Sequence, residues 1–268
     1  MRADFCRAAA SYDEAAVLAR EVGLRMAARL DFVKLAPARV ADIGCATGDG
    51  IRILQARYPQ ALPLAIDYAP AMLAEVARRV TWGDRLRRRA PRCVAADVRG
   101  LPLANGALGL VWSNLMLHWL DDPLPALREL ERVLDAGGLL MFSALGPDTL
   151  RELRAAGAAT LRRFHDMHDL GDRLMAAGFA DPVMDTERIE LTYARPRGLL
   201  RDQRLLGVRD GLLGPMGFRA GRGVFRALEQ ARRDGRLPAT FEIIYGHAWK
   251  AEPKTTTADG RAIIQFRK

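Results

Sequence analysis

Val40 to Gly48 read VADIGCATG, an apolar run that ends in a turn with two glycines. Residues 50–58 read GIRILQARY and have the apolar spacing of a helix. A strand, a glycine-containing loop and a helix in this order bring backbone N–H groups close to a nucleotide-like ligand. Glycine turns between strands and helices are common, so the motif predicts such a site only together with other residues at matching distances.

Three further apolar runs follow, with polar side chains at or near their ends. LPLAID (62–67) ends in Asp67, RCVAADV (92–98) carries Asp97, and ALGLVWSN (107–114) ends in Ser113-Asn114. Helical patterns separate these runs, and the alternation is typical of a doubly wound parallel α/β sheet. The carboxyl ends of parallel strands share one edge of the sheet, so we expect both acids beside the glycine turn.

The same patterns predict the order of the remaining elements. Strands are expected over 39–43, 62–67, 92–96, 109–113, 139–145, 183–193 and 240–251, and helices over 5–30, 49–57, 70–80, 123–138, 148–164 and 167–178. Residues 262–266, AIIQF, either add a short strand or lie outside the sheet. We divide the chain into an N-terminal helical cap (1–36), a core (37–194), an insertion with one or two helices (195–237) and a final strand with a tail (238–268).

The composition indicates a globular protein, because half of the 268 residues are apolar. No apolar run reaches the roughly 18 residues of a membrane span, and the N-terminus lacks the apolar core of a secretory signal. Cys6, Cys45 and Cys93 share no metal-ligand spacing, so we interpret them as reduced thiols. We therefore expect a cytoplasmic protein, and we favour a monomer.

The net charge of +9 is concentrated in two zones. Residues 78–92 hold seven arginines against Asp84, and residues 195–236 hold eleven arginines against four acids. Such zones fit an acidic protein, a nucleic acid or an anionic substrate, and they equally fit a solvated arginine-rich surface. A nucleic-acid methylating site is not expected, because the fourth strand is followed by Leu115-Met116 rather than by a proline-rich base-binding loop.

The glycine spacing distinguishes two classes of ligand. Nicotinamide-binding turns have the pattern G-x-G-x-x-G, whereas this turn has Gly44, Gly48 and Gly50. It resembles the D/E-x-G-x-G-x-G turn of S-adenosylmethionine (SAM)-dependent methyltransferases, with Ala46 in place of the middle glycine. We expect the extra methyl group of Ala46 to be tolerated.

Residues 38–146 as a whole resemble the class I SAM-dependent methyltransferases, and a narrower resemblance covers residues 5–251. FCRAAASYD (5–13), SNLMLHWLDDPLPALRELERVLDAGGLLMFSALGPDTLRELR (113–154) and ATFEIIYGHAWKA (239–251) are similar to the biotin-pathway malonyl-acyl-carrier-protein O-methyltransferases. This resemblance implies a Rossmann-like sheet of seven strands, with an N-terminal helix and a helical insertion before the last strand. Complex I assembly-factor hydroxylases share the DTLRELR segment and residues 167–185, which leaves a hydroxylase or assembly role as the alternative.

The residues and the resemblance together predict a SAM site at the strand ends. Asp67 is expected to accept hydrogen bonds from the ribose hydroxyls, and Asp97 from the adenine amino group. Asn114 and Leu115 should face the methionine end of the cofactor. The predicted cofactor-binding residues are Asp42, Gly44, Cys45, Ala46, Gly48, Asp67, Tyr68, Met72, Asp97, Val98, Asn114 and Leu115.

The resemblance implies methyl transfer from SAM to the free carboxylate of malonyl-acyl carrier protein. A carboxylate is ionised at pH 7, so no general base is required and no obligatory catalytic histidine is expected. His118 and Trp119 are predicted as pocket wall or orienting donor, and Tyr12 as a residue that closes over the cofactor. A methyltransferase for another small carboxylate or for a quinone is a further alternative.

Arginine is suited to holding the substrate carboxylate. Arg201 and Arg204 are the candidates, with Arg209 behind them, and the other arginines of 195–236 could steer an acidic carrier protein. His165 and Asp169 are four residues apart and could share a helix face, yet no third and fourth ligands accompany them. No metal site is therefore predicted.

Overall fold

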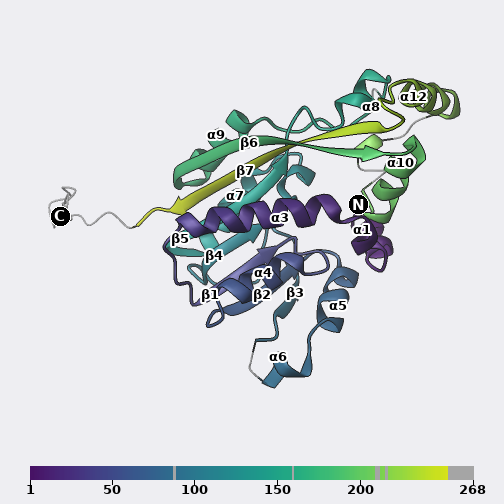
Figure 1. Cartoon of the computed structure of the whole chain (residues 1–268). Coiled ribbons are helices and arrows are strands. Elements are labelled where there is room, and N and C mark those ends of the chain that lie inside the picture. The colour runs from purple at the N-terminus through teal and green to yellow at the C-terminus, as the bar shows by residue number, and fades with distance from the viewer. Residues whose placement is uncertain (87–88, 159, 209–211, 215–216, 253–268) are drawn as a thin grey trace, which may run out of the picture.

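The computed structural model describes residues 1–86, 89–158, 160–208, 212–214 and 217–252 (Figure 1). Its centre is one seven-stranded sheet with the order β3-β2-β1-β4-β5-β7-β6. The predicted seven-stranded α/β sheet is thereby confirmed. Within these described ranges, no helix has the length and apolar character to cross a membrane.

The sheet is parallel except at β7. Its strands are β1 (Arg39–Ile43), β2 (Leu62–Asp67), β3 (Arg92–Ala95), β4 (Leu108–Ser113), β5 (Leu134–Leu145), β6 (Phe179–Tyr193) and β7 (Leu237–Lys250). Strand β7 runs antiparallel between β5 and β6. In the parallel part, Asp42 of β1 pairs with Ala65 of β2 and with Trp112 of β4. The loops that follow these three strands therefore lie at the same edge of the sheet.

Helices cover both faces of the sheet. Helices α3 (Val17–Arg29), α4 (Asp49–Arg57) and α5 (Pro70–Arg78) pack on one face, and α7 (Leu124–Val133) and α9 (Met167–Ala177) pack on the other. Figure 1 shows α3 and α4 on the near face of the sheet. Alternate strand residues serve the two cores: Val40 faces the α3–α5 side, and Ala41 and Ile43 face the α7–α9 side.

The N-terminus differs from the single helix predicted over 5–30. It forms α1 (Arg2–Ala8), α2 (Tyr12–Ala15), α3 and a short 3-10 helix η1 (Leu30–Phe32). The break lies at Ser11, whose hydroxyl donates to the carbonyls of Ala8 and Leu205. A side-chain bond to the preceding turn competes with helix continuation. Met26 of α3 is fully buried, so residues 1–36 contribute to the core as well as forming a cap.

The segment after β5 also differs from the prediction. A helix was expected over 148–164, whereas α8 covers only Arg151–Ala155 and residues 160–164 are irregular. Gly157 has a φ of +89°, which stops the helix. Beyond it, the Arg162 N–H donates to Leu212 O at 2.8 Å. In this segment, hydrogen bonds to residues far away in the sequence therefore replace the hydrogen bonds of a helix.

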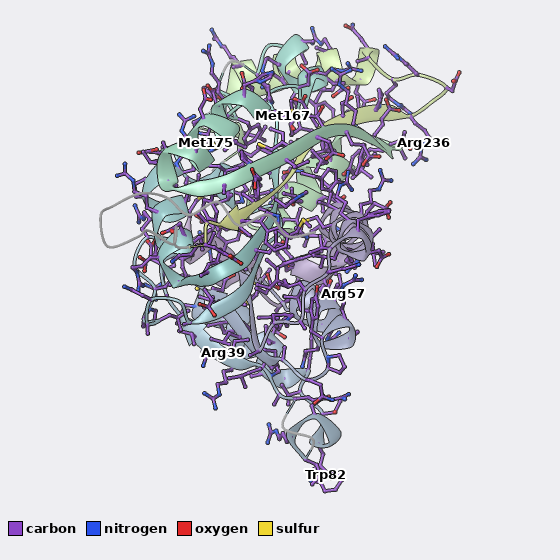
Figure 2. The ribbon with its side chains drawn as sticks, turned by 90° about the vertical axis from the view of Figure 1, so that its left-hand side faces the viewer. Arg39, Arg57, Trp82, Met167, Met175 and Arg236 are labelled. Atoms are coloured by element: carbon purple, nitrogen blue, oxygen red, sulfur yellow. The ribbon has the colours of Figure 1, made fainter. Side chains whose placement is uncertain are left out.

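Smaller differences concern element ends. Gly137 and Gly138 were predicted to end a helix, but they lie within β5, where the register with β4 shifts. The short helix α6 (Trp82–Leu86) was not predicted, and Figure 2 shows Trp82 at its outer tip. The insertion contains α10 (Pro196–Leu205) and α12 (Phe218–Gln230), as predicted. The AIIQF segment lies outside the described residues.

Candidate functional site: an acid-lined cavity at the strand ends

The glycine turn is held against the end of β2. The N–H groups of Gly44 and Cys45 donate to Ile66 O at 2.8 and 3.1 Å. Gly44 has a φ of +76°, and a Cβ there would lie 2.5 Å from Met116 Cγ. Only glycine therefore lets the turn pass this close to the segment after β4. Ala46 has a φ of +44°, an unfavourable conformation for alanine.

Asp67 is fixed by backbone donors on both sides of its carboxylate. Its Oδ2 accepts from Ala46 N at 3.0 Å and its Oδ1 from Ala69 N at 2.8 Å. Burial raises the pKa of Asp67, and these backbone hydrogen bonds partly oppose the shift. The strand end thus presents a half-buried carboxylate in one orientation directly beside the glycine turn.

A cavity of about 310 Å³ lies above this turn. The predicted site residues in its wall are Tyr12, Gly44, Ala46, Asp67, Tyr68, Met72, Asp97, Val98 and Trp119. The wall also contains residues that were not predicted: Met1, Phe5, Ile43, Ile66, Ala96, Arg99, Met116, Leu120 and Asp121. The wall therefore combines residues that follow β1, β2, β3 and β4 with the two N-terminal helices.

A smaller cavity of about 40 Å³ shares Tyr12, Gly44 and Ala46 with the larger one. It brings in the predicted residues Asp42, Cys45 and Asn114. Burial, followed by the charge of Asp67, raises the pKa of Asp42 to about 8. The Asn114 side chain donates to Ala19 O at 2.8 Å and accepts from Ser143 Oγ at 2.8 Å, so it is held in place by α3 and β5.

Two predicted cofactor residues lie outside these two cavities. Gly48 is the N-cap of α4, with a φ of +97°, and it lines a separate cavity on the other side of the turn. Leu115 has a φ of +53° and donates its N–H to Ser143. Both residues shape the turns around the site, and contact with a ligand stays a prediction for them.

The N-terminal helices close over the cavity. The Phe5 and Trp119 rings meet edge to face with centroids 5.9 Å apart. Asp13 fastens this cover to the glycine turn, because Thr47 Oγ1 donates to its Oδ1 at 2.6 Å and Arg79 forms an ion pair with it. Phe5 and Asp13 belong to the FCRAAASYD motif, so a sequence signal for this cover existed even though only Tyr12 was singled out.

His118 is buried behind the wall rather than in it. It lies in the 3-10 helix η2 (Leu117–Trp119), and its ring contacts those of Trp119 and Phe164. Its Nδ1 accepts a long hydrogen bond of 3.4 Å from Leu145 N. Burial, followed by the charge of Arg162, lowers the pKa of His118 to about 3. This corrects the expectation of His118 as pocket wall, because the imidazole is neutral and packed in the core.

Arg162 holds the turn that carries Trp119. Its guanidinium donates to His118 O at 3.2 Å, to Trp119 O at 3.0 Å and to Asp121 Oδ1 at 2.6 Å. His165 Nε2 lies 3.1 Å from Asp121 O. The irregular segment after α8 thus positions three successive wall residues, 119–121. The helix expected over 148–164 did not predict this role of Arg162.

The predicted substrate arginines lie outside the cavity. Arg201 and Arg204 are exposed on α10, and neither lines the 310 Å³ space. Arg201 forms a 3.4 Å ion pair with Glu14. Neither Arg201 nor Arg204 therefore reaches this cavity, and Arg209, the third arginine of the predicted set, lies outside the described residues. Among the described residues, no group of three or more His, Cys, Asp or Glu is arranged as a metal site.

Comparisons with known proteins place this geometry in a class. Residues 41–142 match the family model described as a methyltransferase domain. The YcgJ protein of Bacillus subtilis has a similar fold, with a TM-score of 0.60 at 15% identity, over 87% of this chain and 98% of that one. The fold is the Rossmann-like fold of the methyltransferases.

Two curated relatives are similar over nearly the whole chain. Both are named malonyl-[acyl-carrier protein] O-methyltransferase. The one from Laribacter hongkongensis is 50% identical and covers 99% of this chain and 94% of its own length. The one from Gallionella capsiferriformans is 48% identical with the same two coverages, 99% and 94%. The chain belongs to the malonyl-[acyl-carrier protein] O-methyltransferase family.

Proposed function

We propose that this protein transfers a methyl group from SAM to the free carboxylate of malonyl-acyl carrier protein, giving the methyl ester that enters biotin synthesis. The family membership supports the reaction and the substrate. The observation that carries the cofactor assignment is a pair of neighbouring carboxylates, Asp42, which is buried, and Asp67, which is half-buried. Among the described residues, neither has a basic side chain bonded to it.

This acid-rich site fits SAM, which carries a positive sulfonium, a positive amino group and two ribose hydroxyls. Asp67, already oriented by Ala46 N and Ala69 N, would accept the ribose hydroxyls. Asp42, at the smaller cavity, would face the positively charged methionine end. Asp97 and Val98 line the part of the larger cavity after β3, which suits the adenine. The positive charge of SAM bound beside Asp42 would also favour the ionised form of this carboxyl group.

When bound, SAM supplies an activated methyl group. The malonyl carboxylate is ionised at neutral pH, so the protein needs only to align it and exclude water. The side chains of Phe5, Tyr12 and Trp119 would cover the cavity and exclude water from the reacting groups. Burial and the neighbouring acids raise the pKa of Tyr12 well above its ordinary value, so its hydroxyl stays a donor. The neutral, buried His118 would keep Trp119 in place and take no proton.

The test is a methyl-transfer assay with isotope-labelled SAM. Malonyl-acyl carrier protein and malonyl-pantetheine are offered side by side, and product mass and lability in mild base are read. A base-labile gain of one methylene on the malonyl thioester is expected. SAM binding without methylation of either thioester would reject the assignment and favour the hydroxylase or assembly alternative.

We further infer that the protein acts in the cytoplasm as a monomer. Cys6, Cys45 and Cys93 are all free in the structure, which suits a reducing compartment. Sedimentation analysis at micromolar concentration tests the monomer, because a dimer would give twice the mass.

A further inference from the structure

Helix α10 presents a face of arginines to solvent. Arg197, Arg201 and Arg204 are spaced three and four residues apart and are all exposed, so they share one side of the helix. The opposite side carries Leu199 and Gln203, which are both buried. The glutamate that pairs with Arg201 is itself more than half exposed, so water screens this ion pair and leaves it easily exchanged.

Helix α12 repeats the arrangement. Arg219, Arg222 and Arg226 are likewise three and four residues apart and exposed, whereas Val224 and Leu228 on the other side are buried. The single acid of this helix, Glu229, forms a 3.3 Å ion pair with Arg232. The outward side of α12 therefore carries three arginines, and the one acid of the same helix pairs with Arg232.

The two arginine faces belong to one surface beside the cavity cover. The Arg197 guanidinium carbon lies 5.9 Å from the centroid of the Phe225 ring, which joins α10 to α12. At the other end of α10, Leu205 O accepts from Ser11 Oγ at 3.3 Å, and a Cβ at Gly207 would lie 2.9 Å from Ala8 Cβ. The surface thus adjoins the N-terminal helices, and Figure 1 shows α10 next to α1.

We propose that the arginine faces of α10 and α12 form the docking surface for the acidic carrier protein that presents the malonyl group. This inference rests on the proposed function. Two rows of positive charge suit a partner that displays carboxylates along a helix. Docking there would place the carrier next to Phe5 and Tyr12, where a flexible prosthetic arm could enter the cavity. The second basic zone, near α6 and β3, lies at the far end of the molecule (Figure 1).

A charge-reversal experiment tests the surface. In the triple variant R204E/R219E/R226E, kcat/KM for malonyl-acyl carrier protein should fall about tenfold or more, because steering and docking are lost. With malonyl-pantetheine, which has no carrier, kcat/KM should stay within about twofold. Added NaCl should lower the wild-type rate with carrier protein and barely affect the variant.

The matched control is R85E/R92E/R128E, which makes the same charge change at exposed arginines of α6, β3 and α7. Equal losses in both triple variants would overturn the docking surface, and so would an unaffected carrier rate in R204E/R219E/R226E. The single variant R204E, measured over the same NaCl series, gives a second reading that does not depend on the stability of the triple variant. If wild type methylates neither thioester, the proposed function fails, an outcome distinct from normal methylation without any effect of the arginines.

Discussion

The floor and the cover of the cavity are held together by different means. The floor, residues 42–48 and 67–69, is fixed by backbone hydrogen bonds such as those from Gly44 N and Cys45 N to Ile66 O. The cover, residues 1–16 with the turn 117–121, depends on side-chain bonds from distant segments, among them Asp13 to Thr47 and Arg162 to Trp119 O. A floor of this kind is rigid before ligand binds, whereas the cover can be weakened one side chain at a time.

The largest effect is expected in the floor. Asp67→Ala removes the proposed acceptor for the ribose hydroxyls, and we expect SAM affinity to fall about 100-fold, measured by calorimetry. Asp97→Ala is the comparison, because Asp97 is more exposed and paired with Arg99 at 2.6 Å, so about a fivefold loss is expected there. Equal losses for the two variants would contradict the assigned difference between them.

His118 should make the cover sensitive to acid. Its pKa is about 3 in the folded protein and about 6.5 when unfolded, so the unfolded state binds more protons between these values. Its contribution to stability is full above pH 6.5 and is lost as pH falls. Between pH 6.5 and 5 this loss is about 1–2 kcal/mol. Urea unfolding at both pH values should show a smaller decline for His118→Phe than for wild type, and parallel declines would refute the prediction.

Asp13 should matter for cofactor retention. Asp13→Ala removes the bond to Thr47 and the ion pair with Arg79, so SAM should dissociate about tenfold faster in stopped-flow measurements. Asp31→Ala is a matched control, because Asp31 pairs with Arg57 at 2.5 Å in the same N-terminal region without touching the glycine turn. If both variants released SAM at the same rate, Asp13 would not be the residue that fastens the cover to the glycine turn.

Arg162 should affect turnover more than cofactor binding. Arg162→Gln loosens the Trp119 turn, and we expect kcat to fall about fivefold with the SAM affinity within about twofold. Arg163→Gln, at the exposed neighbouring position, should behave as wild type. Partial recovery of kcat in Arg162→Lys is expected, because lysine keeps the charge but not the forked geometry. A change confined to thermal stability would argue against a positioning role.

The smallest effect is expected at Ala46. Its φ of +44° is unfavourable for alanine, and Ala46→Gly relieves about 1 kcal/mol of strain while adding chain entropy to the unfolded state. The net gain in the free energy of unfolding should be about 0.5 kcal/mol, with SAM affinity within twofold. A destabilised variant would show that the alanine methyl group contributes to packing.

The sequence by itself determined the floor. Strand periodicity, the glycines and the acids at strand ends lie close together along the chain, and the rule that parallel strands share a carboxyl edge brings them together in space. These local signals therefore predict Asp67, Asp97 and the glycine turn at one edge of the sheet, and in the structure they line one cavity. The resemblance of 5–13, 113–154 and 239–251 added the family, which the relatives confirm.

The sequence predicted a cover, but only the tertiary structure decided how it is held in place. The break at Ser11 involves a bond to Leu205 O, and the irregular segment after α8 is bonded to Leu212 O through Arg162 N. The Arg162 guanidinium in turn bonds to Trp119 O. All of these partners are far away in the sequence. In the structure His118 lies in the core, and Arg201 and Arg204 lie on an outer surface, which differs from the expectation for all three. The physical reason is that local patterns encode which face of an element is buried, whereas bonds between irregular segments depend on how the whole chain packs.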